Sequence, residues 1–133
     1  MADAVVTTVL DSGPRNHKVR LNNRSDGTGE SEVTKVDAST IEGPEGPGTT
    51  VGSFTVARIE FAVQGMTRVD LLFDATTDDV FASLNPGNGF IDYHGEHLPD
   101  PRSTGFTGDI NLTTVGALGD GSYEITLFLI KKA

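Results

Sequence analysis

The chain has 133 residues, contains no cysteine, and carries 19 acidic against 10 basic residues, which gives a formal net charge of −9. This length suits one domain with one core, and the absence of cysteine excludes disulfides, thiolate chemistry and most structural zinc sites. The acidic balance disfavours binding to nucleic acid or to a membrane surface, since both depend on clustered Lys and Arg. An acidic surface also keeps a protein soluble.

We do not expect the first residues to be a targeting signal. Residues 1–4 have no basic region and no long apolar run, so we do not expect a secretory leader. No stretch approaches the roughly 20 apolar residues of a membrane-spanning helix. We therefore expect the protein to be made and folded in a cytoplasm.

A β-hairpin is predicted at the N-terminus. Residues 4–10 are apolar and β-branched, which favours a strand, and the Gly-Pro pair within residues 11–14 ends it. Residues 17–22 alternate polar and apolar side chains, as a strand with one solvated face does. Charges at Lys18 and Arg20 on that face discourage edge-to-edge aggregation.

A turn-rich loop, a short strand and a long connection follow. Residues 23–30 form the loop and residues 31–37 the half-polar strand. Residues 38–53 are the longest irregular connection, because two prolines and several glycines within 43–48 preclude both a helix and a central strand. We expect this segment to cross between two sheets at the surface, and loops of this length commonly bind partners or move.

The stretch 54–74 is the strongest structural signal, and it predicts two strands joined by a tight turn at residues 64–67. Gly65 supplies the positive φ that hairpin turns require. Alternation assigns one side of each strand to the core, namely Ala57, Ile59, Phe61, Val63, Val69, Leu71 and Phe73. The opposite sides carry Val56, Arg58, Glu60, Ala62, Arg68, Asp70 and Leu72. We expect the four charges among them to pair across the two strands.

Residues 75–84 are compatible with two structures. Thr76 or Thr77, followed by two aspartates, would cap a helix well. The alternation of Val80, Ala82 and Leu84 with Phe81 and Ser83 instead favours a strand, which we prefer. Residues 85–89 form a strong turn, and 90–93 are a short apolar segment.

The C-terminal third contains a second long loop and two strands. Residues 94–108 are the loop, and 109–115 alternate as a strand. After a turn at 116–121, residues 122–131 form the last strand, which is apolar on both faces near its end and is therefore placed centrally in a sheet. The eight or nine short strands predict one all-β domain over 1–133, an antiparallel β-sandwich of jelly-roll or Greek-key type with a flexible N-terminus.

One cluster has metal-ligand chemistry. His94, Glu96 and His97 combine two imidazoles with a carboxylate, which would suit Zn²⁺ or Fe²⁺ in a metal-dependent jelly-roll enzyme. The third ligand matches no established spacing, and the neighbouring Pro99 and Pro101 favour a plain exposed loop. We expect no metal and no cofactor.

The remaining polar motifs do not indicate catalysis. Asp78 and Asp79, with Asp74 nearby, are too close in sequence for the carboxylate separations of glycosidases and are typical of turns and caps. Neither a Gly-x-Ser-x-Gly motif nor a phosphate-binding Gly-rich loop is present. Trp is absent and Tyr occurs twice, so a carbohydrate platform of stacked aromatic rings is not favoured. We expect no enzymatic activity.

Several short motifs together resemble a known group of proteins. They are Ser-Asp-Gly-Thr-Gly-Glu at 25–30, Val33, Lys-Val-Asp at 35–37, Val-Gln-Gly at 63–65, Asp-Ala-Thr-Thr-Asp-Asp at 74–79 and Thr-Gly-Asp-Ile at 107–110. In order and spacing they resemble small virion structural proteins of tailed bacteriophages, of the head decoration or cement type. The resemblance extends from Asp3 to Leu129 and consists of turn and strand pieces without a catalytic signature.

This resemblance implies a role at a capsid surface. A protein of this type binds the outer face of the shell made by the major capsid protein and stabilises the head, as a homotrimer or other homo-oligomer. It would be synthesised in the host cytoplasm and end in the virion. The alternative is a carbohydrate- or receptor-binding β-sandwich module of a phage tail.

The predicted partner-binding residues come from the N-terminal segment and the two long loops. They are Ala2, Asp3, Glu42, Pro44, Glu45, Pro47, His94, His97, Pro99, Arg102 and Phe106.

Overall fold

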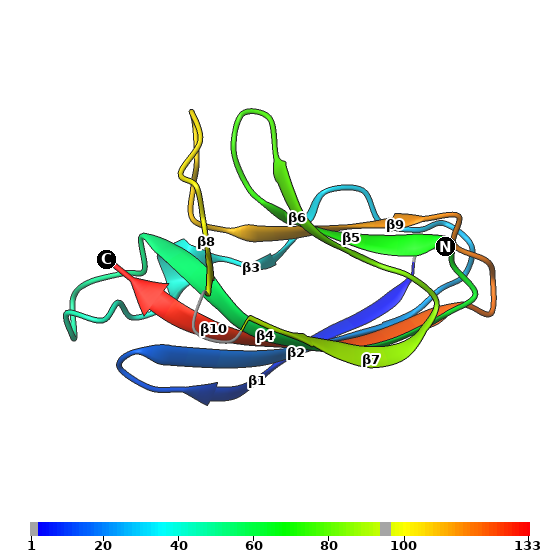
Figure 1. The fold of residues 1–133 in the computed structure, drawn as a ribbon, viewed down its shortest axis with the longest axis horizontal. Coiled ribbons are helices and arrows are strands. Elements are labelled where there is room, and N and C mark those ends of the chain that lie inside the picture. The colour runs from blue at the N-terminus through cyan, green and yellow to red at the C-terminus, as the bar shows by residue number, and fades with distance from the viewer. Residues whose placement is uncertain (1–2, 94–96) are drawn as a thin grey trace.

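The computed structural model describes residues 3–93 and 97–133, which form a two-layered antiparallel β-sandwich (Figure 1). A larger sheet has the strand order β1-β2-β10-β4-β7, with β8 also paired to β4, and a smaller sheet has the order β3-β9-β5-β6. The strands of the larger sheet are β1 (Ala4–Ser12), β2 (Asn16–Arg24), β4 (Ser53–Gln64), β7 (Gly87–Asp92), β8 (Leu98–Pro99) and β10 (Ser122–Lys132). Those of the smaller sheet are β3 (Val33–Val36), β5 (Arg68–Phe73), β6 (Asp79–Leu84) and β9 (Ile110–Val115), and a 3₁₀ turn, η1 (Ala38–Thr40), follows β3.

The strand order is that of a jelly roll. The chain alternates between the sheets from β2 to β5, runs through the β5–β6 pair, returns to the larger sheet at β7, and finishes through β9 and β10. This winding brings β10 between β2 and β4, far from both in sequence, as double Greek-key sandwiches do. The predicted all-β sandwich of jelly-roll type is confirmed, as is the central position of the last strand.

The predicted hairpin at 54–74 is wrong, because β4 and β5 belong to different sheets. β4 pairs with β10 and β7, whereas β5 pairs with β6 and β9. The turn has the expected chemistry, since Gly65 has φ 68°, but it carries the chain from one layer to the other. Two strands with matching apolar alternation can either hydrogen-bond side by side or stack their apolar faces across a core, and here they stack.

The charges expected to pair between β4 and β5 pair within each strand instead, and Arg58 also binds Asp92 of β7. Arg58 binds Glu60 at 3.1 Å on β4, and Arg68 binds Asp70 at 3.1 Å on β5. Residues two apart on a strand share a face, so an extended guanidinium reaches its neighbour directly. The prediction of pairs between β4 and β5 is therefore wrong for the same reason as the hairpin.

The core lies between the two sheets and follows most of the predicted alternation. Ile59 and Val63 of β4, and Val69, Leu71 and Phe73 of β5, are fully or almost fully buried. Val56 and Leu72, which the alternation assigns to the solvated side, are also buried, whereas Ala57 and Phe61, which it assigns to the core, are only partly buried. In the pairing with β10 the register shifts between Phe128 and Leu129, so β4 contains a bulge that reverses the alternation before residue 58.

The other expected strands agree with the structure apart from their boundaries. β1 and β2 pair as the predicted hairpin, and residues 79–84 are a strand and not a helix. β7 begins at Gly87, inside the predicted turn, and the two-residue β8 lies in the second long loop. Within the part of the chain that the structure describes, no helix is long and apolar enough to cross a membrane.

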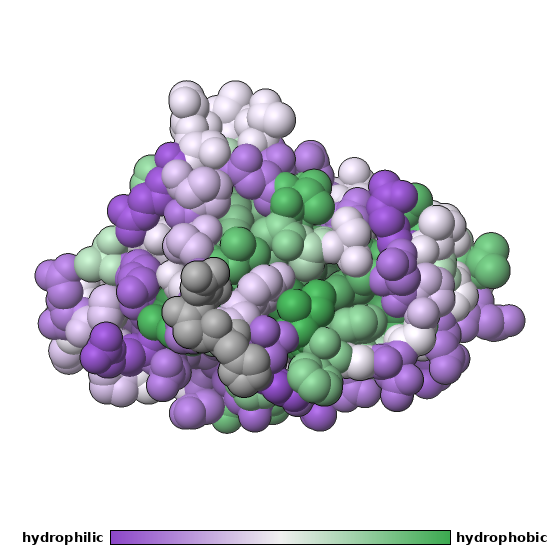
Figure 2. All heavy atoms as spheres, viewed as in Figure 1, coloured by the Kyte–Doolittle hydropathy of each residue, from purple (hydrophilic) through white to green (hydrophobic). Residues whose placement is uncertain are grey.

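One side of the sandwich exposes hydrophobic residues between its two sheets. In Figure 2 hydrophobic residues gather across the middle of the view, above the lower sheet, and hydrophilic residues dominate the margins. β6, β7 and β8 cross this side in the matching ribbon view (Figure 1). Phe81, Ile91 and Leu98 of these strands are partly buried against the core, so this side of the sandwich is closed by side chains that are only half covered.

Candidate functional site

The outer face of the larger sheet is a broad surface, formed by five strands, that is not used for the core. Asn16, Ile130 and Lys132 lie beyond the end of β1, and we define the outer face by the side chains that the strand register places on the side away from the smaller sheet over the length of β1. They are Ala4, Val6, Thr8 and Asp11 of β1; Lys18, Arg20, Asn22 and Arg24 of β2; Ser122, Glu124, Thr126 and Phe128 of β10; Arg58, Glu60, Ala62 and Gln64 of β4; and Asn88, Phe90 and Asp92 of β7.

This outer face is formally neutral on a strongly acidic chain. It holds four basic residues, three of them on β2, and four acidic ones. The whole net charge of −9 therefore belongs to the rest of the molecule. Because like charges repel at close range, a second acidic macromolecule meets less electrostatic repulsion at the outer face than at the acidic remainder of this chain.

Ion pairs and ring contacts order the long side chains of the outer face. Arg58 binds both Glu60 at 3.1 Å and Asp92 at 2.9 Å, and its guanidinium lies 4.2 Å from the centre of the Phe90 ring. Arg20 approaches Glu124 at 3.5 Å. These contacts hold extended side chains in fixed positions, so the face presents a pre-organised pattern of charges.

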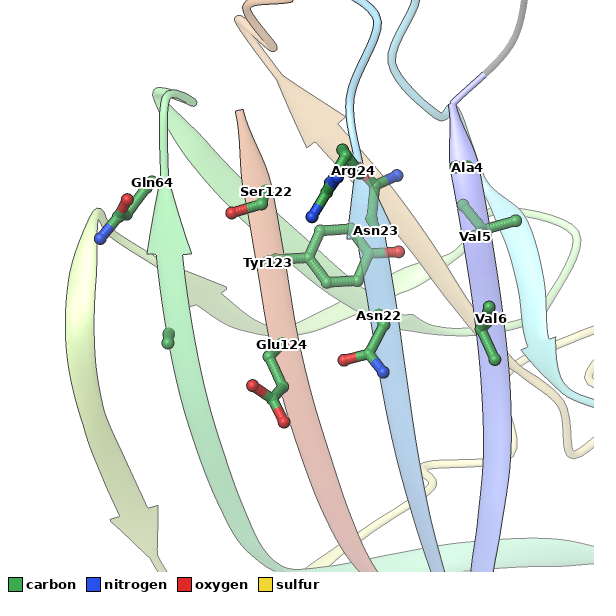
Figure 3. Close-up of a pocket in the computed structure, with 11 residues that line it drawn as sticks. Ala4, Val5, Val6, Asn22, Asn23, Arg24, Gln64, Ser122, Tyr123 and Glu124 are labelled. Carbon is green, nitrogen blue, oxygen red and sulfur yellow. The ribbon is translucent and has the colours of Figure 1, made fainter. Parts of the chain in front are cut away.

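Two adjoining hollows lie on the outer face where its side chains are short. The larger encloses about 660 Å³ and is bounded by Asn22, Arg24, Gln64 and Glu124, with Tyr123 contributing from below (Figure 3). The smaller encloses about 380 Å³ beside Phe90 and shares Ala62 and Glu124 with the first. Together they form a shallow trough across the strands from β1 to β7, which with strand spacing of about 4.8 Å is on the order of 19 Å long.

The floor of the trough rests on a buried polar network. Tyr123 of β10 donates a 2.6 Å hydrogen bond to Glu30, and Asn23 of β2 donates to the same carboxylate at 2.8 Å. Lys35 forms an ion pair with Glu30, and both side chains are 5% exposed. Burial and the adjacent Glu30 carboxylate raise the pKa of the Tyr123 phenol, so this ring is a neutral donor fixed under the sheet.

No protein-family model matches the chain, and no curated protein sequence matches it. Among solved structures it is similar to a carbohydrate binding module family29 structure, with a TM-score of 0.41, 11% identity, and coverage of 96% of this chain and 89% of that chain. It is also similar to a mutant of a carbohydrate binding module of family 29, with a TM-score of 0.41, 9% identity, and coverage of 96% of this chain and 92% of that chain. For a CBM29-2 mutant complexed with mannohexaose, the TM-score is 0.39, the identity is 8%, and the coverage is 98% of this chain and 93% of that chain. At such scores and identities the likeness carries no information about what this chain binds.

The structure separates the predicted partner-binding residues into two groups. Asp3 lies near the end of the sandwich where the chain starts, and Ala2 is outside the described residues. The Asp3 carboxylate accepts hydrogen bonds from Asn23 Nδ2 at 3.0 Å and from the backbone N–H of Asp26 and Gly29 at 3.2 and 3.3 Å. Asp3 therefore anchors the start of β1 to the following loop.

The two long loops lie at the opposite end, beside the C-terminus (Figure 1). Arg102 donates to Ser53 Oγ at 2.9 Å and to the carbonyl of Ala133 at 2.7 Å, and its guanidinium lies 5.3 Å from the Phe106 ring. The loop at residues 38–53 is also held beside the C-terminus, because the backbone N–H of Gly52 donates to the carbonyl of Lys132 at 2.7 Å. The predicted residues there that are described are Glu42, Pro44, Glu45, Pro47, His97, Pro99, Arg102 and Phe106.

The cluster of His94, Glu96 and His97 lies mostly outside the described residues. His94 and Glu96 lie outside the described residues, and His97 is exposed. Over residues 3–93 and 97–133 no group of three or more His, Asp or Glu side chains is arranged to hold a metal ion. Asp74 and Asp78 serve as acceptors, because Asn111 Nδ2 donates to both at 2.9 Å.

Sequence reasoning did not single out the outer face. The alternating polar residues of 17–22 and 122–131 were visible, but nothing local indicated that β2, β10 and β4 are neighbours. The neutrality of the face emerges only when residues more than a hundred positions apart are placed in one sheet.

Proposed function

We propose that this chain is a non-catalytic binding protein of a tailed-bacteriophage head, a decoration protein that docks on the capsid shell through the outer face of the larger sheet. The observation that carries the proposal is the charge distribution: a neutral, ordered face on a molecule whose remaining surface carries the net charge of −9. An acidic protein that coats an assembly at high copy number needs one surface without repulsion and a solvated remainder that keeps it soluble.

The motifs from Asp3 to Leu129 that resemble decoration proteins support the same role. Outward pressure from packaged DNA strains the seams between shell subunits, and a protein docked across a seam adds interface that must be broken before they separate. When several linked copies bind the same shell, avidity makes their overall binding stronger than that of one copy. The ordered pairs of Arg58 with Glu60 and Asp92 suit such docking, because little side-chain freedom remains to be lost on binding.

Binding to DNA-filled particles tests the proposal. Virions purified from the source should contain the protein in fixed ratio to the major capsid protein, and particles lacking it should lose DNA at lower temperature. The double variant Arg20→Glu/Arg24→Glu makes the outer face acidic, and its occupancy on stripped particles should fall at least tenfold. Arg68→Glu, an exposed change on the smaller sheet, is the matched control and should bind normally. Virions without the protein would refute the role.

A second function is favoured by the trough on the same outer face. Asn22, Glu124 and Asn88 place amide and carboxylate groups in one row across the strands, and Phe90 stands beside them with 62% of its surface exposed. Planar polar groups next to an aromatic ring suit an extended carbohydrate, as a phage tail module would bind. Specific binding on a glycan array that is lost in Phe90→Ala and Asn22→Ala, with Phe106→Ala as control, would establish this function in place of capsid docking.

A further inference from the structure

The first strand has a free edge that the other strands of the sandwich do not share. β1 is nine residues long and pairs only with β2 among the described elements. The edges formed by the other strands are blunted in ways that natural sheets use to prevent pairing. β3 has four residues, β8 has two and contains Pro99, β7 has six and carries the charged Asp92, and β6 is interrupted by a register shift.

β1 also exposes large apolar side chains on both of its faces. Val5 and Val9 lie opposite Asn23 and Val19, on the side that faces inward elsewhere in the sheet. The smaller sheet does not cover this edge, so they remain 45% and 56% exposed. Val6 on the outer side is 58% exposed. A long, regular, apolar edge is a template for another strand.

We propose that β1 pairs with β1 of a second copy of this chain, antiparallel and centred on Thr7, to join two larger sheets into one continuous sheet. In this register Val5 of one copy lies opposite Val9 of the other on the inner side, and Val6 lies opposite Thr8 on the outer side. The strand is thus complementary to itself, which an isologous two-fold contact requires. The bulge between Val9 and Asp11 lies beyond the paired residues and limits the ladder to 5–9.

Charge favours a second copy as the partner. Two chains of net charge −9 repel, and the paired residues 5–9 carry no charge, so the two strands meet without like-charge contacts along the ladder. Arg24 lies next to Ala4 on the outer side of the sheet. Because Ala4 is small, the Arg24 guanidinium can extend past it toward Asp11 of the second copy, which adds an attraction at each end of the contact.

The two-fold axis would stand perpendicular to the joined sheet. Both outer faces would then point in the same direction and form one surface of doubled area. The pairing itself does not rest on the proposed capsid role, because it follows from the edge alone. If the capsid role holds, the dimer would engage two lattice sites at once and gain affinity by avidity.

Cysteine cross-linking tests the register. Because the chain contains no cysteine of its own, any disulfide-linked dimer must form through the introduced cysteine. Residues directly opposite in an antiparallel pair have Cα atoms about 4.5 or 5.5 Å apart, within the range that a disulfide spans. Thr7→Cys should therefore form a covalent dimer under mild oxidation. Thr8→Cys is the matched control on the same strand. In the proposed register the introduced cysteine of each copy lies opposite Val6 of the other copy, two positions away from the other introduced cysteine, so this variant should cross-link at least tenfold more slowly.

Sedimentation of the full chain tests the contact without cross-linking. The unmodified protein should have twice the mass of one chain, and Val9→Lys should shift it to a monomer with an unchanged circular dichroism spectrum. Val80→Lys, at a valine of 55% exposure on β6, should remain dimeric. A monomeric unmodified protein, or equal cross-linking of Thr7→Cys and Thr8→Cys, would overturn the proposal. So would loss of particle binding in Val9→Lys without a change of mass in solution, since β1 would then pair with the shell protein.

Discussion

The phenol of Tyr123 donates a 2.6 Å hydrogen bond to the carboxylate of Glu30, across 93 residues of sequence and beneath the outer face of the larger sheet. Glu30 precedes the smaller sheet and Tyr123 is near the start of β10, so this contact ties the two layers together at one end of the sandwich. Lys35 completes the network as the ion-pair partner of Glu30.

Removing the Glu30 charge should destabilise the protein strongly. Glu30→Gln leaves the Lys35 ammonium buried without its counter-charge, which costs about 3–5 kcal/mol in comparable sites. Tyr123→Phe removes a hydrogen bond to a charged acceptor and should cost about 1.5–3 kcal/mol. Urea denaturation gives both values. The control Arg68→Gln breaks an exposed pair and should change stability by less than about 1 kcal/mol. A Glu30→Gln effect no larger than that control would contradict the structural role of the network.

Gly65 should not tolerate a side chain. Its φ of 68° is in the left-handed region, and a Cβ there would lie 2.6 Å from the Cα of Gly121. Gly65→Ala combines a backbone penalty of about 1–2 kcal/mol with a steric clash against another backbone segment, so it should cost more than about 2 kcal/mol in thermal or urea unfolding. Gly13→Ala is the matched control, because a Cβ at Gly13 meets nothing within 4 Å. Equal stability of the two variants would show that the crossing at 64–67 rearranges freely.

Gly65 also shows what sequence reasoning could and could not predict. The alternation of 54–74 correctly predicted two strands, most of their buried residues and a positive φ at the turn. It did not show whether the strands pair or stack, because period two is the same in both arrangements. What decides between them is the set of other partners, β9 for β5 and β10 for β4, whose paired residues are 37–47 and 58–79 positions away in sequence.

The candidate site was less predictable than the fold for the same reason. The predicted contact residues lie in the N-terminal segment and in long Pro- and Gly-rich loops, which are local properties of the sequence. The outer face is a property of the sheet order, and its neutrality depends on Lys18, Arg20 and Arg58 sharing a surface with Glu124. Local signals therefore sufficed for strands and turns, and non-local pairing determined the surface.

Asp100 should make the protein more stable as the pH falls toward 4. Burial raises the pKa of its carboxyl above the ordinary 3.8, with a smaller opposing effect from the backbone N–H of Arg102. Between 3.8 and the raised folded-state value the native state binds more protons than the unfolded state, so stability decreases as pH rises through this window. Asp100→Asn removes this dependence and should be more stable than the unmodified protein at pH 7.

The comparison is made by urea denaturation at pH 7 and pH 4.5. The advantage of Asp100→Asn should shrink at the lower pH, because the natural carboxyl is then increasingly protonated. Asp109, whose pKa burial also raises, contributes in the same direction and remains in the variant. An advantage that grows on acidification would show that the Asp100 carboxylate is stabilised in the fold.

His17 should act in the opposite direction. Its pKa is lowered from the ordinary 6.5, first by burial and then by the nearby positive charge of Lys131. The ring is 3% exposed, lies 5.9 Å from the Phe54 ring and has Ser12 Oγ at 3.0 Å from Nδ1. Below pH 6.5 the unfolded chain takes up a proton that the native state resists, so stability is lost as pH falls from 6.5 through the lowered folded-state pKa. His17→Gln, which keeps a polar partner for Ser12 but does not titrate, should lack this loss.

Stability curves of the two proteins from pH 7.5 to 4.5 should diverge below 6.5, with the unmodified protein falling relative to the variant. Parallel curves would mean that His17 titrates alike in both states.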